Sequence, residues 1–122
     1  MTMIVIDKGV ATAAMAQDAV KTYLQTTYGI AGSRLTNLSQ ALNQAFDGNG
    51  KSCGANRYAG NACLHASAGV PGVSSVSLFY YLGGGGVLNL VAMGAHESST
   101  TYRLSDFGAA DGDFKYKKVL SL

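Results

Sequence analysis

The alternation of residue types between Val73 and Leu82 constrains the fold more than any other part of the chain. Successive side chains of a β-strand point to opposite faces. One face would carry Val76, Leu78, Tyr80 and Leu82, and the other Ser75, Ser77, Phe79 and Tyr81. Four glycines, 83–86, then turn the chain, and the apolar segment VLNLVAMGAH runs back. Because glycine readily adopts the positive φ angles of tight turns, this pattern predicts an antiparallel β-hairpin.

The first part of the chain has a different period. Residues 2–6 (TMIVI) are apolar and β-branched, which predicts a short strand. Apolar residues at helical spacing then predict a helix that ends with Gly29 as its C-cap. A second helix is predicted to begin with Ser33 as its N-cap and to end at Gly48. The apolar stripe of this second helix consists of Leu35, Leu38, Leu42, Ala45 and Phe46.

The remaining segments complete the predicted fold. Residues 47–72 contain six glycines and the only proline, so we expect a loop there, in which a short strand could lie at 62–66. Further strands are predicted at 100–107 and 114–122. The predicted order is β-α-α followed by a four-stranded antiparallel meander. Helices grouped before a meander indicate one α+β domain, residues 1–122, with the helices packed on one face of the sheet.

Composition limits the classes of protein to which the chain can belong. Charged residues make up 13% of the chain and the net charge is +2, which permits an anionic partner but falls short of a strongly basic nucleic-acid binder. No apolar run approaches the roughly 18 residues of a membrane span, and the first residues lack the basic start of a signal peptide. We therefore expect a cytoplasmic protein without membrane contact. Secretion, or delivery into a target cell, stays open as the alternative.

Two cysteines, Cys53 and Cys63, lie in a segment rich in glycine and asparagine. Two cysteines alone do not make a metal site, so no metal is expected there. A disulfide between them would close the loop and stabilise the fold by roughly 2–3 kcal/mol. Reduced thiols in a cytosolic protein are the alternative, and the sequence leaves both open.

The chain has two histidines, and histidine is the side chain best suited to proton transfer at neutral pH. One histidine as base and another as acid, with a cation to stabilise the developing negative charge, suffice for RNA cleavage without a metal or cofactor. The candidate set is His65, His96 and one of Arg57, Arg103 or Lys117. The structural alternative is that both histidines lie on the surface or form hydrogen bonds without a catalytic role.

Tyr102 and Arg103 follow His96 within the segment GAHESSTTYRLS. In a strand these two residues point to opposite faces, so one of them can share a face with the end of the preceding strand. Tyr102 could stack on a base or share a proton, and Arg103 could hold a phosphate with two hydrogen bonds. The structural alternative is a polar turn, with Tyr102 in the core and Arg103 in solvent.

Cations elsewhere in the chain are further candidates for RNA binding. They are Arg57, Lys115, Lys117 and Lys118. In a last strand, Lys115 and Lys117 would share a face and could contact successive phosphates. Lysines on a last strand also protect an exposed sheet edge from pairing with other chains, and this is the favoured interpretation of the two.

The segment SLFYYLGGGGVLNLVAMGAHESSTTYRL resembles the RelE/ParE-type toxins of bacterial toxin–antitoxin pairs. In that family an aromatic strand, a glycine turn and an apolar strand often lead into a Gly-x-His or Gly-x-Arg segment and then a tyrosine. The matching residues here are Gly94, His96 and Tyr102. The resemblance covers residues 73–104 by pattern and residues 2–46 by element order.

The resemblance implies an activity and a partner. It implies metal-independent cleavage of mRNA, free or on the ribosome, in the bacterial cytoplasm, with a cognate antitoxin as the neutralising partner. His96 and Tyr102 would be the acid and base candidates, and Arg103 and the late lysines would bind phosphate. A contact-dependent RNase toxin, with bridged cysteines and an immunity protein as its partner, fits the same observations.

A second hypothesis comes from a different class of protein. The low charge, the loops rich in glycine, serine and asparagine, and the lack of a compact catalytic motif also fit a non-enzymatic binding module. Such a module could be an immunity protein, a phage-encoded inhibitor or an exported adhesin-like subunit.

Overall fold

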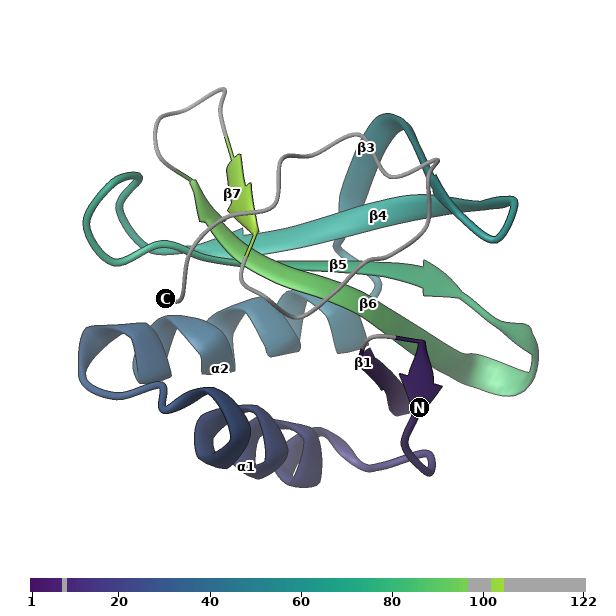
Figure 1. Cartoon of the computed structure of the whole chain (residues 1–122), viewed down its shortest axis with the longest axis horizontal. Coiled ribbons are helices and arrows are strands. Elements are labelled where there is room, and N and C mark those ends of the chain that lie inside the picture. The colour runs from purple at the N-terminus through teal and green to yellow at the C-terminus, as the bar shows by residue number, and fades with distance from the viewer. Residues whose placement is uncertain (8, 97–101, 105–122) are drawn as a thin grey trace.

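The computed structural model of the chain describes residues 1–7, 9–96 and 102–104, and these form an α+β fold (Figure 1). The strands are β1 (Thr2–Asp7), β2 (Val10–Ala11), β3 (Lys51–Tyr58), β4 (Asn61–Ala68), β5 (Val76–Leu82), β6 (Val87–His96) and β7 (Tyr102–Leu104). The helices are α1 (Gln17–Tyr28) and α2 (Ser33–Phe46), and a short 3₁₀ turn, η1 (Gly84–Gly86), joins β5 to β6. Within these ranges, no helix is long and apolar enough to cross a membrane.

The sheet is mixed but largely antiparallel. Its strands lie in the order β2-β1-β6-β5-β4-β3. β1 runs parallel to β6, from the pair Thr2–Val87 to the pair Val5–Leu90, and the other strand pairs are antiparallel. β7 pairs with residues 94–96 at the end of β6. One edge of β6 pairs with β5. The opposite edge pairs with β1 along residues 87–90 and with β7 along residues 94–96.

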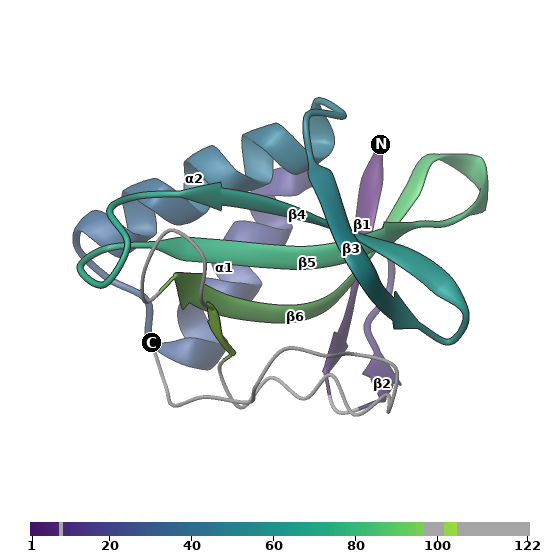
Figure 2. The ribbon, with the colours of Figure 1, turned by 90° about the horizontal axis from the view of Figure 1, so that it is seen from above.

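Both helices lie on one face of this sheet (Figure 2). α1 ends as the sequence predicts: Gly29 adopts a left-handed φ of 66°, and its N–H donates to the carbonyl oxygen of Gln25. α2 differs from the prediction, because Ser33 is its first helical residue and the preceding Gly32 takes the N-cap position without a side-chain capping bond. The predicted N-cap role of Ser33 is therefore wrong. The chain enters the helix through the positive φ of Gly32, 63°, which glycine adopts at little cost.

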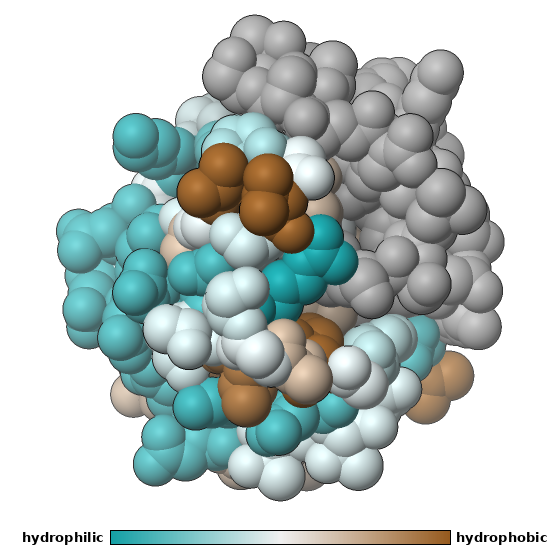
Figure 3. Space-filling view, turned by 90° about the vertical axis from the view of Figure 1, so that its left-hand side faces the viewer, coloured by the Kyte–Doolittle hydropathy of each residue, from teal (hydrophilic) through white to brown (hydrophobic). Residues whose placement is uncertain are grey.

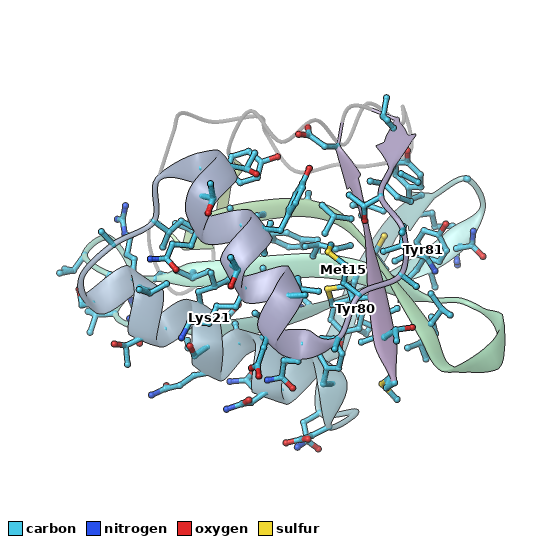
Figure 4. All side chains as sticks on the ribbon, turned by 90° about the horizontal axis from the view of Figure 1, so that it is seen from below. Met15, Lys21, Tyr80 and Tyr81 are labelled. Atoms are coloured by element: carbon cyan, nitrogen blue, oxygen red, sulfur yellow. The ribbon has the colours of Figure 1, made fainter. Side chains whose placement is uncertain are left out.

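The main core lies between the helices and the sheet. Its fully buried residues come from β1, both helices and the three strands β4, β5 and β6, joined by Ile30. They are Met3, Val5, Val20, Leu24, Ile30, Leu38, Ala41, Leu42, Ala45, Ala66, Val76, Leu78, Tyr80, Leu88, Leu90 and Met93. Tyr80 lies within this layer and Met15 packs against it from the segment before α1 (Figure 4). The hairpin alternation read from the sequence thus places Val76, Leu78 and Tyr80 on the core face, as predicted.

The loop expected over residues 47–72 is wrong, although the short strand considered at 62–66 lies within β4. β3 and β4 form an antiparallel pair there, with Lys51 opposite His65. These strands are rich in glycine, asparagine and alanine, which have low β-propensity, so local composition does not reveal them. Pairing of β4 with β5, from Leu64–Tyr80 to Ala68–Val76, supplies the strand hydrogen bonds that local preference does not predict.

The predicted order of the meander also differs from the structure. The antiparallel run is β3-β4-β5-β6, so it begins at Lys51 rather than at Val73. The hairpin around the glycine run is confirmed, since β5 and β6 are antiparallel neighbours joined by η1. Of the strand predicted at 100–107 the structure describes β7, antiparallel to β6. The strand predicted at 114–122 lies outside the described residues.

Candidate functional site

The sheet has another face, opposite the helices (Figure 2), which we call the second face. It carries its own group of apolar side chains. Strand alternation separates the two faces: in β4, Leu64 and Ala66 belong to the main core, whereas Cys63 belongs to the second face. The buried members of the second face are Cys63, Phe79, Val91 and Ala92, and Ile6, Tyr58 and Tyr81 pack against them. An irregularity in the β5–β6 register after Phe79 allows the neighbouring residues Val91 and Ala92 to join the same cluster.

His65 lies on the second face, near the middle of β4. Its strand neighbours are Lys51 on β3 and Phe79 on β5. The imidazole ring lies over the Phe79 ring at a centroid distance of 6.3 Å, tilted by 30°. The imidazole is half-buried and packed on an aromatic ring, so it has one apolar neighbour and remains partly open to solvent.

An aromatic pair lies beside Cys63. The rings of Tyr58 and Tyr81 stack with centroids 6.0 Å apart and an interplanar angle of 15°. Both tyrosines are half-buried, and Arg57, the residue before Tyr58, is exposed. Because neighbouring strand residues alternate, Arg57 and Tyr58 point to opposite faces of β3, so the stacked rings can hold a base whereas Arg57 can contact a phosphate only at the edge of the sheet.

Two serines near His65 form a structural pair rather than a nucleophile. Ser67 and Ser77 are strand partners, and their Oγ atoms lie 2.8 Å apart in a hydrogen bond. Ser77 is fully buried. Each hydroxyl therefore supplies the hydrogen-bond partner that the other needs inside the sheet.

The β6–β7 pairing brings together three residues that the sequence singles out. His96 is the strand partner of Tyr102, and Arg103 is the partner of Ala95. Residues opposite each other in an antiparallel pair have Cα atoms about 4.5–5.5 Å apart. The backbone therefore gathers His96, Tyr102 and Arg103 at one end of the sheet, where β6 and β7 meet.

The structure does not bring His65 to the same place. His65 pairs with Phe79 on β5, and Phe79 pairs with Ala92 on β6. The residue of β6 that is level with His65 is therefore Ala92, four residues before His96. With strands about 4.8 Å apart and a rise of about 3.4 Å per residue, the Cα atoms of His65 and His96 are roughly 17 Å apart. Two histidines acting on the same bond need to be closer, so this geometry does not favour the predicted two-histidine set.

The other predicted residues divide between strands β3 and β4 and the part of the chain outside the described residues. Cys63 is a buried thiol whose Sγ lies 3.9 Å from the carbonyl oxygen of Asn61, and the backbone of Cys53 lies in β3. Lys115, Lys117 and Lys118 lie outside the described residues.

A carboxylate that sequence reasoning missed lies at the end of β1. The hydroxyl of Tyr28, the last residue of α1, donates to Oδ2 of Asp7 at 2.7 Å. The other carboxylate oxygen, Oδ1, is buried and has no hydrogen-bond partner in the part of the chain that the structure describes. A buried acceptor left unpaired costs stability. The sequence signal is weak: an aspartate directly after a strand is common at turns.

Among the described side chains, no group of three or more His, Cys, Asp or Glu is arranged to hold a metal ion. The comparisons with known proteins give no further guide to the site. No protein-family model, curated protein or solved structure matches this chain.

Proposed function

We propose that the chain is a small metal-independent endoribonuclease of the toxin class, neutralised by an antitoxin or immunity protein. The observation that carries this proposal is the β6–β7 register, in which His96 is opposite Tyr102 and Arg103 is opposite Ala95. Two groups that can exchange protons and one permanent cation, on adjacent strands, are sufficient for phosphodiester cleavage by the RNA's own hydroxyl.

In the proposed reaction His96 takes the proton of a ribose 2′-hydroxyl, and the 2′-oxygen attacks the adjacent phosphorus. The bond from phosphorus to the 5′-oxygen of the next nucleotide breaks, and Tyr102 donates a proton to that oxygen. The products are a 2′,3′-cyclic phosphate and a 5′-hydroxyl end. Strand alternation puts Arg103 on the face opposite to Tyr102, so in this proposal its long side chain reaches the phosphate oxygens around the end of the sheet, where its planar set of donors is suited to their negative charge.

The second face supports a role in binding single-stranded RNA, free or on the ribosome. Tyr58 and Tyr81 stack on this face, and Arg57, the residue before Tyr58, is exposed. Base stacking on an aromatic side chain contributes about 1–3 kcal/mol per base. His65, roughly 17 Å from His96 by strand geometry, is assigned to binding in this proposal and not to proton transfer.

The direct test is cleavage of defined single-stranded RNA by the purified chain in the presence of a chelator. The native chain should leave 2′,3′-cyclic phosphate ends, and His96→Ala should lower kcat by about 10²–10⁴-fold, the usual contribution of a general acid or base. His65→Ala should raise KM with little change in kcat. Arg103→Ala, which removes the cation assigned to the phosphate, should also lower cleavage. Its matched control is Lys21→Ala, because Lys21 lies on α1, on the helix side of the molecule (Figure 4). A folded native chain that cleaves no RNA would contradict the proposal.

Toxicity provides a test in cells. Induced expression of the native chain in bacteria should arrest growth, and His96→Ala should restore it at an equal amount of protein. Normal growth with the native chain at high expression would count against a toxin.

The second candidate is the non-enzymatic binding module, and one surface feature favours it. The connection between β4 and β5 exposes Val70 and Val73, with exposed fractions of 58% and 70%, and apolar surface framed by polar atoms is visible on that side of the molecule (Figure 3). The connection is held in place by α2: Arg34 Nη2 donates to the carbonyl oxygen of Val73 at 3.1 Å, and Asn37 Nδ2 to that of Ser74 at 2.9 Å. A fixed apolar tip favours contact with another protein.

The two candidates separate in one experiment. A binding module would keep its partner affinity after His96→Ala and lose it after Val70→Ser with Val73→Ser. A ribonuclease would lose cleavage after the first change and keep it after the second.

A further inference from the structure

The β3–β4 pairing contains a bulge directly after Ser52, where β3 has more residues than β4. Ser52 pairs with Leu64, and the next recorded pair is Arg57 with Ala62. Between these pairs β3 has the four residues 53–56, whereas β4 has only Cys63. The register of the two preceding pairs, Lys51–His65 and Ser52–Leu64, leads directly to Cys53 opposite Cys63. If that register continues by one residue into the bulge, the two cysteines of the chain are opposite each other there.

The backbone spacing at this position suits a disulfide. Opposed residues of an antiparallel pair have Cα atoms about 4.5–5.5 Å apart, within the range of about 4.4–6.8 Å that disulfides span. The four-to-one bulge removes the regular ladder pairing from residues 53–56. Cys63 itself is 1% exposed and fixed among the second-face residues.

We propose that Cys53 and Cys63 form a reversible cross-strand disulfide, made by exchange with a small disulfide such as oxidised glutathione. The thiolate of Cys53 attacks the small disulfide, forms a mixed disulfide and releases one reduced glutathione. The thiolate of Cys63 then attacks the Cys53 sulfur and releases the second, so one oxidised glutathione is consumed and two reduced glutathione molecules leave, which carry the two thiol protons lost by the chain. Burial of Cys63 slows its reaction with an external disulfide, so Cys53 is the residue expected to react first.

The bridge would act on the residues that follow it. Arg57 and Tyr58 re-enter the ladder directly after the bulge, and Tyr58 stacks on Tyr81 beside Cys63. A disulfide that joins Cys53 to β4 limits how far residues 53–56 can move. It therefore also limits the positions that the following residues, Arg57 and Tyr58, can adopt. This inference stands apart from the proposed ribonuclease activity, because it rests on the register and the two cysteines alone.

The test uses the full reduced chain, equilibrated with mixtures of reduced and oxidised glutathione, quenched in acid and analysed by mass spectrometry. The expected product is the chain lacking two hydrogens, with a peptide cross-link between Cys53 and Cys63. Bridging should slow hydrogen exchange of the amides in residues 53–58 and raise the melting temperature by roughly 5–10 °C.

Two variants control the test. Cys63→Ser should gain one glutathione and form no intramolecular bridge. In the second control, Cys53→Ser is combined with Ser52→Cys, which moves the thiol to the residue that pairs with Leu64 and should bridge at least 10-fold less at the same glutathione ratio. The native chain is also treated with oxidised glutathione alone. If glutathione then accumulates on Cys53 while Cys63 remains a thiol, the proposal is wrong. Equal bridging by the shifted control would overturn its geometric basis.

Discussion

At the scale of single residues, Gly50 carries a steric constraint that its sequence context does not show. A Cβ atom at this position would overlap the hydroxyl group of Tyr80, whose ring is 1% exposed. Because a fully buried ring cannot swing aside without disturbing the core, we expect Gly50→Ala to lower the free energy of unfolding by about 1–3 kcal/mol. Urea denaturation followed by circular dichroism measures this.

Gly84→Ala is the matched control, because nothing lies within 4 Å of a Cβ built there. It should be neutral or stabilise by up to about 1 kcal/mol. Combining Gly50→Ala with Tyr80→Phe removes the overlapping hydroxyl, so the double variant should lose less stability than the sum of the two single losses. Strict additivity would show that the two residues do not clash.

At the scale of elements, a side chain of α2 takes the place of a strand beside β4. Gln44 Nε2 donates to the carbonyl oxygen of Ser67 at 2.8 Å, and the N–H of Ser67 donates to Gln44 Oε1 at 3.2 Å. β3 begins at Lys51, opposite His65, so its ladder stops short of Ser67. Gln44→Ala leaves both backbone groups without these partners, and we expect a loss of about 1–3 kcal/mol in the free energy of unfolding.

The control for Gln44 lies on the same helix. Gln40 is exposed, so Gln40→Ala removes a similar side chain from the solvent side of the helix and should change stability by less than about 0.5 kcal/mol. Equal effects of the two variants, measured by denaturation, would assign the loss to helix propensity instead of to the Gln44–Ser67 bonds.

The same scale explains which elements the sequence predicts. α1 with its Gly29 cap and the β5–β6 hairpin depend on signals within a few residues, and both agree with the structure. β3 and β4 do not, because their stability comes from pairing with β5 and from Gln44 and not from β-branched residues. In the candidate site, the meeting of His96 with Tyr102 follows from a short connection and could be predicted. The Tyr58–Tyr81 stack depends on strand pairs that the sequence did not reveal.

At the scale of the whole molecule, the parallel pairing of β1 with β6 joins the start of the chain to its last described hairpin. Thr2 pairs with Val87, and Met3 and Val5 are fully buried in the same core as the helices. A contact between residues so far apart in sequence forms only when the segments between them are arranged. We therefore expect β1 to unfold together with the rest of the protein.

Met3→Ala tests this cooperativity. It should lower the free energy of unfolding by about 2–5 kcal/mol, as for other buried large-to-small changes, while unfolding remains one transition with coincident curves from circular dichroism and tyrosine fluorescence. Val10→Ala, in β2 at 72% exposure, should change stability by less than about 0.5 kcal/mol. If Met3→Ala instead released β1 alone, hydrogen exchange would become fast at residues 2–7 and stay slow in β5 and α2. That outcome would show that β1 is a local addition to a core that folds without it.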